Sequence, residues 1–146
     1  MGSLLRGLGV SLPGDMISPD THNPKGYFEW QEVVDIQERL LIDLDRWWPS
    51  YKGYLPLPPD WLTAPATSKA KENLTRLILK EVKANNTFAI KDPRSSRFIL
   101  LWSAIAKDLS IPLKLILTIR DPSEVIASLV NRDFDVTGMT YVRAQQ

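Results

Sequence analysis

The chain has 146 residues, of which 44% are hydrophobic and 24% are charged, and these proportions are typical of a soluble globular protein with one core. Its formal net charge of +1 gives no general attraction to nucleic acid or acidic membranes, so any anion must be bound by locally placed groups. The lack of cysteine excludes disulfides and thiolate metal sites, and the single histidine, His22, cannot form a zinc site without several carboxylates.

The cellular location follows from the same sequence features. No apolar run reaches the roughly 18 to 20 residues needed to span a bilayer. The first residues, MGSLLRGLGV, lack the long apolar core and cleavage site of a signal peptide. We therefore expect a cytoplasmic protein with no metal and with neither nucleic acid nor membrane as partner.

The first long element is a predicted helix. Apolar residues recur at steps of three and four up to Trp47, which predicts a helix from about Phe28 to Trp47 that ends at Pro49. A second, shorter amphipathic helix is predicted around Leu74 and Val82.

Between these helices, residues 49–68 read PSYKGYLPLPPDWLTAPATS, which is rich in proline and aromatics and has no period. This composition predicts an irregular surface insertion. Its PLPP motif would either dock onto a proline-recognising domain or form a stiff loop that packs Trp61 back onto the domain. We favour the stiff loop, because short proline motifs are common in loops.

Two apolar segments predict a parallel sheet. TFAIK (87–91) and LKLILTI (113–119) are short, almost wholly apolar and bounded by turn residues, as expected for strands that are covered on both faces. SRFILLWSAIAKDL (96–109) lies between them and has helical spacing suited to a right-handed crossover. We therefore predict an α/β layered fold in one domain, residues 1–146.

A basic residue ends each predicted strand, Lys91 in the first and Arg120 in the second, and Asp-Pro follows each. Asp92 and Asp121 are good helix N-caps, and Glu124 would complete a capping box at the second corner. The helix starts of parallel strands meet at one sheet edge, where free N–H groups favour phosphate or sulfate. Two basic corners thus predict an anion site at this edge.

An ordinary structural interpretation of the corners is equally open at this point. Asp-Pro is common helix-start chemistry, and a basic residue at a strand end often reaches out to water. Ser128 lies about two turns into the second helix, where its hydroxyl would either turn sideways to an anion shared with Arg120 or bond to a carbonyl of its own helix.

Three motifs resemble one family. Arg120-Asp-Pro followed by Ser128 resembles the 3′-phosphate-binding segment of sulfotransferases that use 3′-phosphoadenosine 5′-phosphosulfate (PAPS). IKDPR (90–94) resembles the strand-end lysine segment of the tyrosylprotein and bacterial branches, and NPKGYFEWQEVVDIQERLL (23–41) resembles a bacterial-branch segment. The resemblance extends from about Leu4 to Arg132, with the three motifs in the family's order.

This resemblance implies a role for each residue. Arg120 and Ser128 would hold the 3′-phosphate of PAPS, and Lys91 would stabilise charge at the sulfuryl group. Glu29 would be either the general base or a first-turn glutamate that stabilises the following helix. Arg94 would reach the nucleotide or only neutralise the same edge. The cytosolic branch places its histidine base just after the strand-end lysine, where this chain has Asp92 and Pro93, so His22 is expected to be a loop residue and not the base.

The N-terminus departs from the family. Gly2 and Ser3 match the end of the phosphosulfate loop, but the strand and basic residue that precede this loop in the family are missing, and the family usually continues well past position 146. The resemblance therefore implies a partial P-loop-type three-layer fold, with about two parallel strands flanked by helices, shortened at both ends. We expect impaired or absent catalysis. We also expect self-association, such as a homodimer, through the unpaired sheet edge or through an N-terminal helix that contains Leu4, Leu5 and Leu8.

The sequence favours two functions. The first is transfer of a sulfuryl group from PAPS to a hydroxyl or amine acceptor that the sequence does not specify. The alternative is a non-catalytic module derived from that fold, which binds a nucleotide or another protein. A nucleotide kinase is disfavoured, because we find no complete Walker loop.

Overall fold

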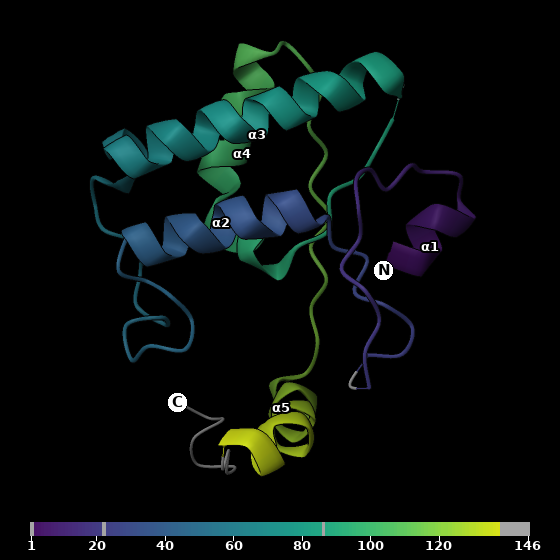
Figure 1. Cartoon of the computed structure of the whole chain (residues 1–146), viewed down its shortest axis with the longest axis vertical. Helices are drawn as coiled ribbons and strands as arrows, with labels where there is room; N and C mark the ends of the chain where they lie inside the picture. Colours follow the sequence, from purple (N-terminus) through teal and green to yellow (C-terminus); the bar gives the residue numbers. More distant parts are fainter. Residues whose placement is uncertain (1, 22, 86, 138–146) are drawn as a thin grey trace. The chain divides into compact units, whose positions relative to one another are not determined.

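A computed structural model describes residues 2–21, 23–85 and 87–137, and the chain divides into two compact units, residues 1–113 and 114–146. We describe each unit by itself. In chain order, the elements are α1 (Gly2–Gly7), α2 (Gln31–Asp43), η1 (Trp61–Thr63), α3 (Pro65–Ala84), η2 (Pro93–Arg97), α4 (Ile99–Asp108) and α5 (Pro122–Thr137) (Figure 1). No described helix is long and apolar enough to cross a membrane.

The first predicted helix is confirmed as α2, although it is shorter at both ends. It starts only at Gln31, because Phe28 has a left-handed φ of 57° that no helix interior allows. It ends at Asp43, since Asp45 again has a positive φ of 55°. One face is buried, as the apolar spacing predicted, and it comprises Val33, Val34, Gln37, Leu40 and Leu41.

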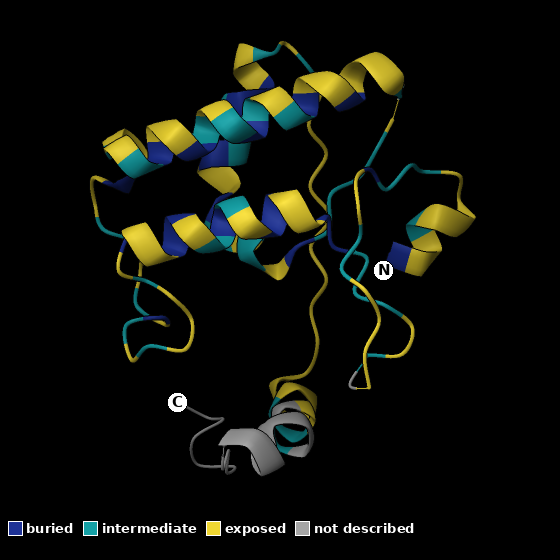
Figure 2. Ribbon diagram, in the orientation of Figure 1, coloured by how far each residue is buried: buried dark blue, intermediate teal, exposed yellow. Residues whose placement is uncertain are grey.

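The second predicted helix is confirmed as α3, and it is longer than expected. Pro65 occupies its first turn, where the missing N–H costs nothing, so the last four residues of the predicted irregular insertion are helical. The buried face of α3 repeats at steps of three and four and packs against α2 and α4. In Figure 2 the buried positions of both helices lie in stripes, with exposed residues on the opposite sides.

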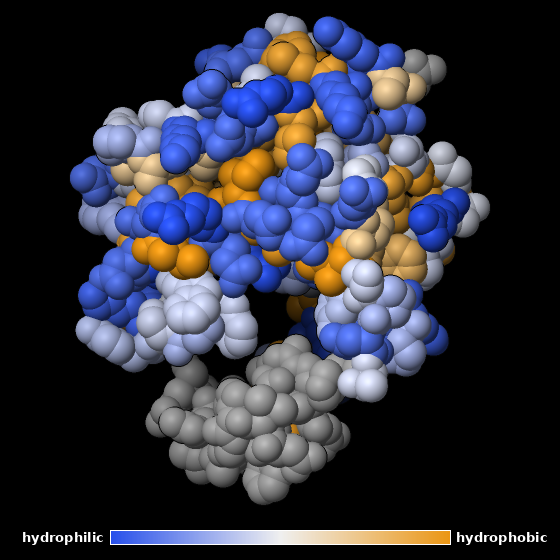
Figure 3. Space-filling view, in the orientation of Figure 1, coloured by the Kyte–Doolittle hydropathy of each residue, from blue (hydrophilic) through white to orange (hydrophobic). Residues whose placement is uncertain are grey.

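The core of the first unit joins α2, α3 and α4. Trp61 is 8% exposed and its ring lies 5.7 Å, centroid to centroid, from that of the fully buried Phe98. This contact confirms the prediction that the proline-rich loop packs Trp61 back onto the domain. The face seen in Figure 3 is largely hydrophilic over α2 and α3, and apolar side chains show in the seam between them.

The predicted parallel sheet is wrong. The described residues contain only two isolated bridges, a parallel one between Ser11 and Phe88 and an antiparallel one between Met16 and Trp30. The side chains of Phe88 and Ile90 do pack against the core, so this segment is apolar for the expected reason. A β-strand, however, also needs backbone hydrogen bonds to a neighbouring strand. Within residues 87–91, only Phe88 forms a β-bridge. Over residues 2–21, 23–85 and 87–137 the structure is mostly helical and forms no three-layer α/β fold.

The second predicted strand is also wrong. Residues 113–119 have no regular secondary structure, and their large apolar side chains are exposed, from 44% at Leu113 to 86% at Ile119. The helix predicted over residues 96–109 is confirmed in part as α4, which begins at Ile99 only after the 3-10 turn η2. Its predicted role as a crossover is wrong, because residues 87–91 and 113–119 form no sheet. The helix predicted after Asp121 is confirmed as α5.

Candidate functional site

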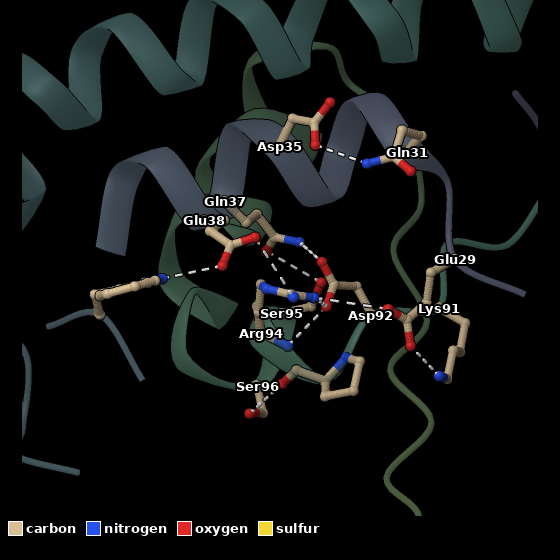
Figure 4. A network of polar contacts seen from close by, with 12 residues as sticks. Glu29, Gln31, Asp35, Gln37, Glu38, Lys91, Asp92, Arg94, Ser95 and Ser96 are labelled. Atoms are coloured by element: carbon tan, nitrogen blue, oxygen red, sulfur yellow. Dashed lines mark hydrogen bonds and ion pairs between the residues drawn. The ribbon is translucent and has the colours of Figure 1, made fainter. Parts of the chain in front are cut away.

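Lys91 and Glu29 form an ion pair although 62 positions separate them in the chain. The Glu29 side chain is only 8% exposed and that of Lys91 is 30% exposed. A buried carboxylate is costly unless its charge is compensated, so the ammonium is the natural partner for Glu29 here. The structure thus brings together the predicted general base and the predicted basic group (Figure 4).

The backbone around Glu29 is fixed on both sides. Its carbonyl accepts the N–H of Ile17 at 2.9 Å, and the next residue, Trp30, bridges to Met16. Glu29 precedes α2 by two positions, so it does not lie in the first turn as the alternative interpretation required. The preceding residue, Phe28, has a left-handed backbone, which is rare for a bulky side chain, and strain of this kind clusters at functional sites.

Gly2 lies against the Phe28 side chain. A Cβ added at Gly2 would stand 2.4 Å from the Phe28 Cβ, so only glycine allows this contact. The Arg6 guanidinium lies 5.9 Å from the centroid of the Phe28 ring. The segment that resembles the end of the phosphosulfate loop therefore packs beside the residue next to Glu29, whereas the following Ser3 is exposed.

Lys91 is positioned by the residue that follows it. The Asp92 side chain caps η2 by accepting the backbone N–H of Arg94 at 2.9 Å, as its N-cap prediction required. It also accepts the Gln37 amide N–H at 2.7 Å. The Gln37 amide oxygen in turn accepts from Ser95 at 3.2 Å and from Trp102 at 3.3 Å. One buried amide of α2 thereby holds η2 and α4 in place.

Arg94 lies among three carboxylates (Figure 4). Its guanidinium is 2.9 Å from Asp92, 3.6 Å from Glu29 and 3.8 Å from Glu38, and its Nε is buried with no hydrogen-bond partner. Only the Asp92 contact has hydrogen-bond length. The cluster formed by these four residues and Lys91 holds three carboxylates and two cations, so acids outnumber bases within it.

An aromatic loop, residues 45–57, adjoins the cluster. The Trp47 indole N–H donates to Glu38 at 3.1 Å. The Arg97 guanidinium donates to the backbone carbonyls of Gly53 at 2.5 Å and Leu55 at 2.6 Å. Burial, and then the nearby Arg46, lower the pKa of Arg97 from its ordinary value, but an arginine stays charged at any physiological pH. The loop is therefore fastened at several points.

The aromatic loop leaves a cavity of about 410 Å³ against the helices. Its walls include Tyr54, Pro56, Leu57, Trp61 and Leu100. This cavity is broadly open to solvent, so it encloses a ligand less than ordinary small-molecule sites do.

Arg120 and Ser128 belong to the second unit, and both are exposed. Asp121 accepts the backbone N–H of Ser123 at 2.8 Å and its hydroxyl at 2.5 Å, which confirms Asp121 as the N-cap of α5. These bonds, with the Ser123 hydroxyl first, hold the pKa of Asp121 below its ordinary range. The predicted helix start is therefore confirmed, but no strand precedes it among the described residues, so the predicted sheet edge that would join it to the Lys91 corner is wrong. His22 lies outside the described residues.

Sequence reasoning missed two members of the site, Gln37 and Glu38. Gln37 interrupts the apolar stripe of α2 at a position that the helical period buries, and a polar residue at such a position signals a partner. Glu38 follows Gln37 on α2 and carries no comparable signal, because exposed glutamates are common on helices.

No family model, no curated protein and no solved structure matches this chain. Within residues 2–21, 23–85 and 87–137, no group of three or more histidine, cysteine, aspartate or glutamate side chains could hold a metal ion.

Proposed function

We propose that this chain is a sulfotransferase-like protein that binds PAPS, the family's donor of a sulfuryl group to a hydroxyl or amine acceptor, and that its own catalysis of this transfer is impaired or absent. One observation carries the proposal. Glu29 and Lys91, to which the resemblance gives the base and the sulfuryl-stabilising role, form an ion pair in the folded chain despite their distance in sequence. A cytoplasmic location fits the absence of cysteine.

The chemistry of the side chains suits this reaction. Bound PAPS would supply an activated sulfuryl group. The Lys91 ammonium has three donors and is 30% exposed, so it can hold negative oxygens of that group. The carboxylate of Glu29 accepts a proton, which an attacking hydroxyl or amine must lose. Arg94 lies 3.6 Å from Glu29 and adds positive charge beside this carboxylate.

Arg120 and Ser128 are proposed to bind the 3′-phosphate. Arg120 lies two positions before the start of α5, where the positive end of the helix dipole favours an anion. Arg120→Ala should weaken binding of adenosine 3′,5′-bisphosphate by about 1.5–3 kcal/mol, the scale of a charge-assisted hydrogen bond. Adenosine 5′-phosphate, which lacks the 3′ group, should bind equally well to both proteins.

Titration calorimetry with both nucleotides tests this assignment. Equal losses for the two ligands would show that Arg120 does not contact the 3′-phosphate. Lys114→Ala is a suitable control, because Lys114 is an exposed cation in the same unit, six positions earlier. It removes the same charge without touching the helix start.

The aromatic loop supports a second candidate function, a protein-interaction module. Trp48, Tyr51 and Tyr54 are 62%, 74% and 71% exposed, and exposed tryptophan and tyrosine are enriched where proteins bind one another. Capture of a protein partner that is lost in Trp48→Ala and retained in Lys91→Ala would favour this function. Trp61 is unsuitable for the test, because its burial makes its loss a change to the core.

A further inference from the structure

The ion pair that supports the proposed function also blocks it. The side chain that would receive a phosphate or sulfuryl oxygen, Lys91, is already bound to the carboxylate of Glu29. An anion that approaches Lys91 therefore meets a neighbouring negative charge as well as a positive one. The excess of carboxylates over cations in the cluster adds to this repulsion.

We propose that Glu29 is an internal anion that occupies Lys91 until a nucleotide phosphate displaces it. This inference rests on the proposed function and concerns the regulation of the same site. Nucleotide binding and proton transfer are then ordered. The nucleotide binds first, and only then is the Glu29 carboxylate free to accept a proton from the acceptor.

The geometry shows which partner moves. Glu29 is buried, its carbonyl is bonded to Ile17, and its carboxylate keeps a second cation, Arg94, at 3.6 Å. Lys91 is more exposed and carries its charge at the end of a flexible four-carbon chain. Lys91 therefore swings toward the anion, while Glu29 stays in place beside Arg94. The remaining contact is longer than a hydrogen bond, so Glu29 regains free acceptor capacity.

Replacing Glu29 with the neutral amide of equal size tests the competition. Because Lys91 is freed before the ligand arrives, Glu29→Gln should bind adenosine 3′,5′-bisphosphate more tightly than the wild type, by about five- to twentyfold. We expect the low end of the usual coupling range, since Lys91 is partly exposed and water weakens the pair. Adenosine 3′-phosphate, which lacks the 5′ group, should show no such gain.

Two variants distinguish the direct Glu29–Lys91 contact from a general effect of charge in the cluster. Glu38→Gln removes the same charge from the cluster, but Glu38 contacts Arg94 and Trp47 rather than Lys91, so its affinity should change less than about twofold. In the Lys91→Met background, Glu29→Gln should give no gain in nucleotide affinity, because no ammonium is left for the substitution to release. Cooperative thermal unfolding of each variant establishes that it is folded.

A measurement on the wild-type protein avoids substitution altogether. With glutamate labelled at Cδ, saturating nucleotide should shift the Glu29 carboxyl resonance and leave that of Glu38 in place. Binding that leaves Glu29 unshifted, or an equal gain in Glu29→Gln and Glu38→Gln, would overturn the competition while the proposed function stands. If neither the wild type nor Glu29→Gln binds the bisphosphate, both proposals fail.

Discussion

Gln37 is the residue on which the local structure of the site depends most directly. Its side chain is fully buried and bonds to the carboxylate of Asp92 and to the side chains of Ser95 and Trp102. Asp92 is the neighbour of Lys91, so α2 positions the candidate basic group through one amide. Removing that amide leaves a buried carboxylate short of a donor.

Gln37→Leu should therefore lower the free energy of unfolding by about 1–3 kcal/mol, the cost of leaving buried polar groups unpaired. Gln31→Leu provides the control, because Gln31 lies on the same helix, is exposed, and its side chain bonds only to Asp35 among the described contacts. Its effect should stay within about 0.5 kcal/mol. Urea unfolding measures both, and equal losses would show that the buried network contributes nothing specific.

At the scale of elements, helices were easier to predict than strands. The apolar stripe of α2 is a property of its own residues, so the helix was predictable, and so was the capping role of Asp92 and Asp121. The strands were not, because residues 87–91 and 113–119 are apolar and β-branched whether or not another backbone lies beside them. The helix boundary at Phe28 was equally hidden, since a bulky residue rarely takes a left-handed φ and its packing against Gly2 is a tertiary contact.

The start of α5 has a pH dependence with a definite sign. The folded pKa of Asp121 lies below the ordinary value, so its contribution to helix stability is present above that ordinary pKa and is lost as pH falls through the folded pKa. Ser123→Ala removes the hydroxyl that is the main cause, so the pKa of Asp121 should rise toward 3.8, its ordinary value. Carbon-detected NMR titration of the Asp121 carboxyl measures this rise. An unchanged pKa in Ser123→Ala would show that the Ser123 hydroxyl is not the main cause of the lowered pKa.

For the molecule as a whole, the notable feature of residues 113–119 is that their large apolar side chains are exposed. Leu115, Ile116 and Leu117 are 60%, 63% and 76% exposed in a segment without regular structure. Exposed apolar segments of high β propensity pair readily with other chains. Self-association was expected from an unpaired sheet edge, and the exposed segment gives that proposal a specific surface.

Leu117→Lys should therefore shift the protein toward the 16.6 kDa monomer, because a charge cannot be buried cheaply in a strand pair or an apolar interface. Leu4→Lys tests the other proposed surface, since Leu4 is 65% exposed on α1. Light scattering after size exclusion at micromolar concentration distinguishes the two. A wild type that is monomeric under these conditions would contradict self-association through either surface.

Titration calorimetry with adenosine 3′,5′-bisphosphate shows whether Lys91 belongs to a nucleotide site. Lys91→Ala should weaken binding by about 1.5–3 kcal/mol, which is roughly ten- to 150-fold. Lys80→Ala removes an exposed cation of α3 and should leave the affinity unchanged. Wild-type binding that Lys91→Ala leaves intact, or no binding by the wild type at all, would contradict the assignment of this site.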